Sequence, residues 1–248
     1  MKQLSKTAYL PWLTLFAGGV GLFLRFWLFT TGVDARGLLV EGHPADLMIW
    51  LLTAIVMVGL WFATRPLAAA PQCDFNYPPS LTAAIGCGFA ALGVSITSFQ
   101  TLLTWEDTLT LIAAIVGSAA AVTFVLLAML RYRGQQPSIL HHVIPCLFFM
   151  LRLISLYRHW STNPQLQNYS FQLLVTVFLM LSAYYRAAFD ADMSRRRPLV
   201  LCYLITVFFC CLSITDLEAA IFYLPAGIWI FTDLCSLELL QPQTQEEP

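Results

Sequence analysis

Residues 104–133 read TWEDTLTLIAAIVGSAAAVTFVLLAMLRYR: an acidic turn, a long apolar run and an end that contains arginine. A helix needs about 20 apolar residues to cross the hydrocarbon core of a bilayer, and the run over 107–130 meets that length. Because a lipid-facing strand would leave backbone groups unpaired, a helix is the expected form. The acids Glu106 and Asp107 precede it, where the helix dipole favours negative charge. The stretch therefore predicts one transmembrane helix.

The composition of the whole chain agrees with this prediction. Of its 248 residues, 58% are hydrophobic and 11% are charged, and the mean hydropathy is +0.72. A soluble domain carries about a quarter charged residues, so most of this chain must face lipid or other helices. The net charge of -1, with Arg195-Arg196-Arg197 as the main basic tract, argues against nucleic acid as a partner.

The length criterion, applied along the chain, predicts an all-α polytopic bundle of about eight transmembrane helices. Seven is the alternative, because the last two candidate segments are short and the gap between them is small. The predicted segments are 9–30, 44–64, 80–103, 107–130, 138–157, 168–190, 198–215 and 217–239.

Lysine and arginine predict the orientation, because cytoplasmic loops of membrane proteins are enriched in them. If the N-terminus is cytoplasmic, Arg36 and Arg158 fall outside, and Arg25 and Arg152 fall within apolar segments. The other basic residues all fall on the inner side: Lys2, Lys6, Arg65, Arg131, Arg133, Arg186, Arg195, Arg196 and Arg197. Both termini are therefore expected in the cytoplasm.

The chain is expected to form a single transmembrane domain over 1–240, because the gaps between apolar segments are too short to fold alone. The polar tail, 241–248, is expected to be disordered and cytoplasmic. The first and fifth segments each carry an arginine near the outer end, and the fourth and eighth each follow acidic residues. This regularity suggests two parallel four-helix halves, 1–130 and 138–240, an arrangement found in some transporters.

Small residues and prolines predict features of helix packing. Gly18-Gly19-Val20-Gly21 and Gly86-Cys87-Gly88, together with Gly93, are expected to form faces on which neighbouring helices approach closely. Pro145 and Pro225 lie within predicted helices, where they could kink the helix or open backbone groups to a cavity.

The motifs of intramembrane enzymes are missing from the sequence. It has no HExxH zinc motif and no GxSxG nucleophile turn. The histidines divide between the two predicted sides, and His141 and His142 are expected to be solvated at the cytoplasmic interface. The sequence therefore predicts no catalytic set, no metal site and no cofactor, and it favours a role other than catalysis.

The candidate binding residues are arginines near the predicted outer surface. Arg25 and Arg152 lie in apolar segments, where an arginine is costly and points to function unless its side chain snorkels to the headgroups. Asp34 or Glu41 could pair with Arg25, and Arg158 opens the polar loop over 158–165. Guanidinium groups that converge there would form an outward-facing site for a carboxylate or phosphate.

Two stretches carry a resemblance to a known family. They read TGVDARGLLVEGHPADL over 31–47 and PCLFFMLRLISLYRHWSTNPQLQNYSFQLL over 145–174. They resemble a family of uncharacterised multi-pass membrane proteins from clostridial-type bacteria, and the resemblance extends over most of the chain. It implies a bacterial cytoplasmic membrane and carries no activity.

Two functions of different classes remain open. The first is a small-solute or anion transporter, or binding protein, whose partners are the lipid bilayer and a small anionic solute. The second is a non-catalytic membrane subunit, a sensor or assembly partner that binds another protein. A transporter should lose ligand binding when Arg25 or Arg152 is replaced by Gln, whereas a partner subunit should tolerate both changes.

Overall fold

The structure is a computed structural model that describes residues 9–32, 42–67, 78–104, 107–161, 166–191, 193–214 and 216–237, without the side chains of 159–160 and 166–169. Over these residues the chain forms eight α-helices and no strand. The helices are α1 (Leu10–Thr31), α2 (Pro44–Ala63), α4 (Leu81–Leu103), α5 (Thr108–Arg133), α6 (Leu140–Trp160), α7 (Leu166–Asp190), α8 (Arg196–Leu212) and α9 (Leu217–Ser236). Each begins and ends within a few residues of a predicted segment, so the predicted all-α bundle is confirmed.

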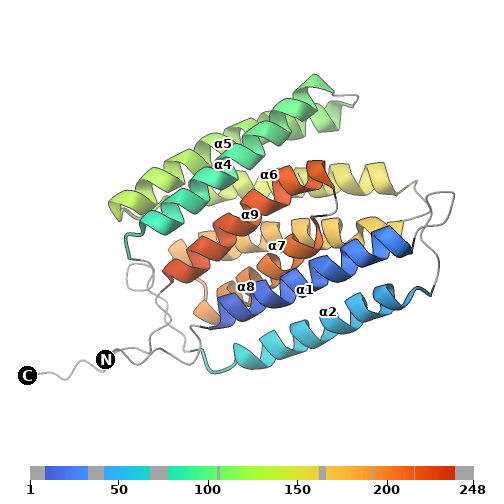
Figure 1. Cartoon of the computed structure of the whole chain (residues 1–248). Coiled ribbons are helices and arrows are strands. Elements are labelled where there is room, and N and C mark those ends of the chain that lie inside the picture. The colour runs from blue at the N-terminus through green and yellow to red at the C-terminus, as the bar shows by residue number, and fades with distance from the viewer. Residues whose placement is uncertain are drawn as a thin grey trace, which may run out of the picture.

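The helices run side by side, and successive helices reverse direction (Figure 1). The start of α1 and the end of α9 therefore lie at the same end of the bundle, which we call the N-terminal end. In the described part of the chain, seven helices are long and apolar enough to cross a membrane. The eighth, α8, has 17 residues and is the shortest.

Local sequence explains where several helices begin and end. Pro44 occupies the first position of α2, where its missing N–H costs nothing. Asp216 caps α9, because its carboxylate accepts from the N–H of Ala219 at 2.7 Å. The last turn of α5 closes at Gly134, whose φ of 67° is the left-handed conformation that glycine adopts readily. These signals set which side chains stand at the two ends of the bundle.

α8 is the centre of the bundle, and most of its residues are buried. It packs against α1, α2, α7 and α9, whereas α4 and α5 pack against α9 and α6. The hairpin of α1 and α2 therefore packs mainly on α8, away from the hairpin of α4 and α5. The outer helices expose large apolar side chains such as Phe16, which is 74% exposed, as expected of a lipid-facing surface. The two parallel halves stay a prediction.

Glycines set two of the closest helix contacts. A Cβ added at Gly18 would lie 2.9 Å from the Cβ of Cys211 in α8, and one at Gly93 would lie 2.8 Å from the Cβ of Pro225 in α9. Gly21 and Gly86 are also tightly packed, so the predicted small-residue faces are confirmed at these positions. The prediction is wrong for Gly19 and Gly88, because neither has an atom within 4 Å of an added Cβ.

Charge is distributed unequally between the two ends of the bundle. The helix ends at the N-terminal end carry the arginines Arg65, Arg131, Arg133, Arg186, Arg195, Arg196 and Arg197. The acids at the starts of α2, α5 and α9 stand at the opposite end: Asp46, Asp107, Asp216 and Glu218. Among the described residues, the basic side chains that the sequence predicts on the cytoplasmic side therefore lie at one end of the bundle.

Candidate functional site: a buried ion network

Asp233, near the end of α9, contacts three side chains at the N-terminal end of the bundle. Its Oδ1 lies 3.3 Å from Nη2 of Arg131, at the end of α5. Its Oδ2 lies 3.3 Å from Nη1 of Arg186, near the end of α7, and accepts from the Tyr203 hydroxyl of α8 at 2.9 Å. Side chains of three helices thus meet one carboxylate of a fourth.

Arg186 extends this arrangement to a second carboxylate. Its Nε lies 3.1 Å from Oδ1 of Asp190, one turn later on α7. Oδ2 of Asp190 lies 2.6 Å from Nε2 of His142, in the first turn of α6. We call Arg131, Asp233, Arg186, Asp190 and His142 the ion network. It connects α5, α9, α7 and α6 at one level of the bundle.

The ion network is almost completely shielded from solvent. None of its five side chains is more than 7% exposed. Burial of charge is expensive, and mutual attraction offsets that cost only when the pairs are complete. Two guanidinium groups face two carboxylates here, so the formal charges balance when the imidazole of His142 is neutral. Such groups within an apolar bundle are usually retained for function.

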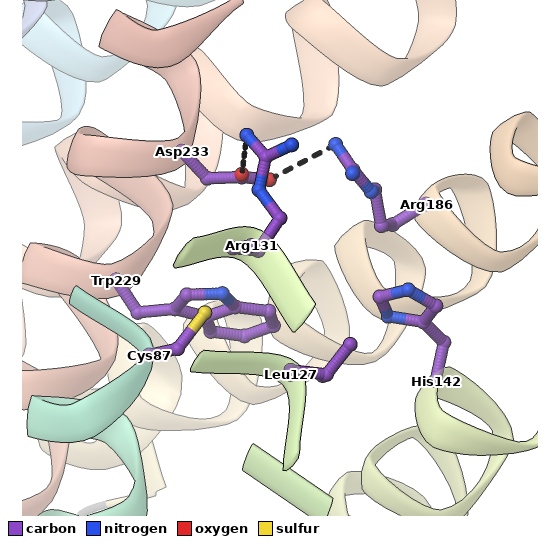
Figure 2. Close-up of a pocket in the computed structure, with 7 residues that line it drawn as sticks. All are labelled: Cys87, Leu127, Arg131, His142, Arg186, Trp229 and Asp233. Atoms are coloured by element: carbon purple, nitrogen blue, oxygen red, sulfur yellow. Dashed lines mark hydrogen bonds and ion pairs between the residues drawn. The ribbon is translucent and has the colours of Figure 1, made fainter. Parts of the chain in front are cut away.

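A small cavity lies within the ion network, and Figure 2 shows the side chains that line it. They are Cys87, Leu127, Arg131, His142, Arg186, Trp229 and Asp233. The space has about the size of one water molecule. Its polar walls suit a water or a proton, and it is too small for an organic solute.

Arg25 lies at the opposite end of the bundle, in the second half of α1. It is 3% exposed, and its guanidinium carbon lies 4.7 Å from the ring centroid of Phe171 in α7 and 5.3 Å from that of Phe29. Asp46 at the start of α2 interacts with it electrostatically. Contacts with aromatic faces stabilise a guanidinium that has left water.

Arg152 lies at the same end as Arg25, in the second half of α6. Its guanidinium carbon stacks 3.8 Å from the ring centroid of Phe222 in α9, and it interacts with the hydroxyl of Tyr223. The Tyr223 hydroxyl donates to the backbone oxygen of Gln172, the residue after the Phe171 that Arg25 contacts. Arg25 thus contacts Phe171 of α7 directly, whereas Arg152 is connected to the next residue of α7 through Tyr223.

The other two predicted site residues lie apart from these arginines. Asp34, like Glu41, is outside the described residues. Arg158 forms an ion pair with Asp107 at 3.1 Å, and each side chain is 58% exposed. The pair joins the end of α6 to the start of α5 at the surface. A pair so exposed contributes little to stability.

Sequence analysis missed the ion network. It counted Arg131 and Arg186 among the charges on the cytoplasmic side and gave them no partner; both are buried within the bundle. It expected His142 to be solvated; this is wrong, because His142 is buried against Asp190. The signal it overlooked is Asp233, an acid inside the last apolar segment. Such a carboxylate is costly without a cation on another helix.

Comparisons with known proteins found no family model, curated protein or solved structure that matches the chain. The function is therefore inferred from the ion network and from the two arginines at the other end of the bundle.

Proposed function

We propose that the protein is a multi-pass protein of the bacterial cytoplasmic membrane that binds and transports a small anionic solute. In this proposal the N-terminal end faces the cytoplasm, and so do both termini. The gathering of arginines at the N-terminal end supports this orientation, because positive charge is enriched on the cytoplasmic side of membrane proteins. The bacterial membrane follows from the resemblance of the two stretches quoted above.

The observation that carries the proposal is the buried ion network at one end of the bundle. A transporter must expose its site to one side of the membrane while the other side is closed. Ion pairs among α5, α7 and α9, together with the contact of His142 on α6 with Asp190, would close the cytoplasmic side. A bundle with only a structural role gains little from them, since well-packed apolar residues are often as stable as buried ion pairs.

Arg25 and Arg152 supply the chemistry of the proposed solute site. Both lie at the end opposite the ion network, and both pack on aromatic rings inside the bundle. A guanidinium binds a carboxylate or phosphate through two parallel hydrogen bonds. The site would therefore select a small carboxylate or phosphate that arrives from outside the cell.

The experiment measures uptake and binding of probe anions by the purified protein. Radiolabelled inorganic phosphate, acetate and succinate are offered to proteoliposomes, and thermal unfolding is followed with each probe. We expect one probe to be taken up and to raise the unfolding temperature, because a ligand that binds only the folded protein stabilises it. Arg25→Gln and Arg152→Gln should lose both effects.

Arg133→Gln is the matched control, because Arg133 is an exposed arginine at the other end of the bundle. It should keep uptake and stabilisation. The transporter proposal fails if no probe is taken up and none raises the unfolding temperature. If a second protein then co-purifies with both Arg25→Gln and Arg152→Gln, the partner-subunit hypothesis is favoured.

A further inference from the structure

Arginines of two neighbouring helices gather where α2 ends and α8 begins. Arg65 lies in the turn that follows α2, and the Arg195-Arg196-Arg197 tract lies at the start of α8. Both places are at the N-terminal end of the bundle (Figure 1), and α2 packs against α8. Arg197 joins them directly, because its guanidinium carbon lies 4.7 Å from the ring centroid of Trp61 in α2. We call Arg65, Arg195 and Arg197 the basic cluster.

No carboxylate of the described part of the chain forms an ion pair with the basic cluster. Arg131 and Arg186, at the same end of the bundle, instead face Asp233. Nη2 of Arg197 is buried and has no hydrogen-bond partner among the described residues. A buried N–H without an acceptor is costly, so an anion from outside the chain would stabilise this position.

The start of α8 attracts the same kind of ligand. The first turn of a helix carries free N–H groups and a partial positive charge, which together attract anions. Helices often place an acid or a capping side chain there. The described start of α8 has neither, since its first turn contains no acid and its N-cap residue, Arg195, makes no side-chain cap. The helix dipole and the guanidinium groups therefore favour one anion together.

Exposed aromatic rings indicate that the basic cluster lies beside lipid headgroups. Trp61 and Phe62 are both exposed in the last turn of α2, and the guanidinium carbon of Arg65 lies 4.6 Å from the ring centroid of Phe62. Tryptophan near the end of a membrane helix usually lies at the headgroup level. α8 has 17 residues, about 25 Å of helix, which is shorter than the roughly 30 Å hydrocarbon core. Its first arginines therefore stay within reach of the headgroups.

The lipid-facing side of α2 continues from the basic cluster as an apolar surface. Leu51, Ile55, Val58 and Phe62 are exposed and follow one another at helical spacing. An acyl chain that lies along these side chains would place its headgroup at the end of α2. A soluble phosphate would use the same guanidinium groups but would leave this surface uncovered.

We propose that the basic cluster and the start of α8 bind the phosphate of an anionic phospholipid, whose acyl chain lies along the exposed face of α2. Clusters of arginine beside a membrane helix bind anionic headgroups through charge attraction and hydrogen bonds to phosphate. The site lies at the opposite end from Arg25 and Arg152, so the inference does not depend on the proposed anion transport.

Native mass spectrometry of the full-length protein, released from detergent micelles, measures lipid binding. Phosphatidylglycerol and phosphatidylcholine with the same acyl chains are added in equal amounts, because the two lipids differ in the net charge of the headgroup. We expect the protein to retain phosphatidylglycerol in preference to phosphatidylcholine. Equal retention of the two lipids overturns the proposal.

Arg65→Gln and Arg197→Gln should each weaken the binding of phosphatidylglycerol about fivefold, the usual contribution of one arginine beside an anionic membrane surface. Arg133→Gln is the matched control, because it removes an exposed arginine of α5 at the same end of the bundle. It should bind phosphatidylglycerol as wild type does. Equal losses in all three variants overturn the proposal, because the attraction then comes from overall charge and not from this site.

The exposed position of Arg65 keeps the test decisive if Arg197→Gln does not fold. Removal of an exposed arginine leaves the packing of the bundle unchanged, and the unfolding temperature without lipid checks this for each variant. If a folded Arg65→Gln binds phosphatidylglycerol as tightly as wild type, the basic cluster is not the lipid site.

Glycerol 3-phosphate distinguishes a lipid from a free phosphate, because it carries the phosphate without an acyl chain. At the same concentration as phosphatidylglycerol it should displace no lipid. If it displaces the lipid, the site binds a soluble phosphate and the lipid proposal fails.

Discussion

Asp233 is the residue on which the ion network depends most. Arg186 and Tyr203 donate to its carboxylate, and Arg131 forms an ion pair with it. The carboxylate thus balances two guanidinium groups that have little access to water. Removal of one member of a buried ion pair leaves the other charge uncompensated, which usually costs more than the pair itself contributed.

We therefore expect Asp233→Asn to lower the free energy of unfolding by about 3–5 kcal/mol, the usual cost of a buried charge without its partner. Unfolding of the purified protein in detergent micelles measures the change. Asp107→Asn is the control, because it breaks the exposed pair with Arg158 and should cost less than about 1 kcal/mol. Equal losses in the two variants would mean that the ion network contributes no more than a surface ion pair.

The helices α4 and α9 meet at a glycine of α4 and a proline of α9. Pro225 has no N–H, so the carbonyl of Ile221 lacks its usual partner within α9. α9 nevertheless continues through this position. Gly93 of α4 packs against the same place, since a Cβ added there would lie 3.0 Å from the Ile221 oxygen and 2.8 Å from the Pro225 ring. Both neighbours are rigid.

Gly93→Ala should therefore destabilise the protein by about 1–3 kcal/mol, the usual cost of overpacking a tight contact. Gly88→Ala is the matched control on the same helix. It has no atom within 4 Å of the added Cβ, so its unfolding temperature should not fall. The unfolding temperatures of both variants, measured under the same conditions, test this. If Gly93→Ala unfolds at the same temperature as wild type, α4 and α9 can separate at no cost.

Because successive helices reverse direction, the orientation of the whole protein in the membrane can be tested at two exposed positions. Met193, between α7 and α8, is 86% exposed at the N-terminal end. Leu217, the first residue of α9, is 79% exposed at the opposite end. The enrichment of positive charge at the N-terminal end predicts that Met193 faces the cytoplasm.

We expect Leu217→Cys to react with a membrane-impermeant thiol reagent in intact cells. Met193→Cys should react only after the cells are permeabilised, and wild type gives the background from the native cysteines. The reverse pattern would show that the N-terminal end faces outward.

The apolar segments were predictable because each needs only its own residues. Length and hydrophobicity decide whether a segment crosses a bilayer, and proline, aspartate or glycine then marks where it begins or ends. For this reason α2 begins at Pro44 and α9 follows Asp216, as expected. The candidate site was predictable only in part: Arg25 and Arg152 do lie inside helices at one shared end.

The sequence by itself determined the class of the protein, the helices and the unequal distribution of charge, because these depend on local composition. Only the tertiary structure decided which charges meet. Asp233, Arg131 and Arg186 lie on three helices, and their pairing depends on the rotation and depth of each helix against its neighbours. His142 shows the same limit: it stands at a predicted helix start, and only the packing of α6 on α7 buries it against Asp190.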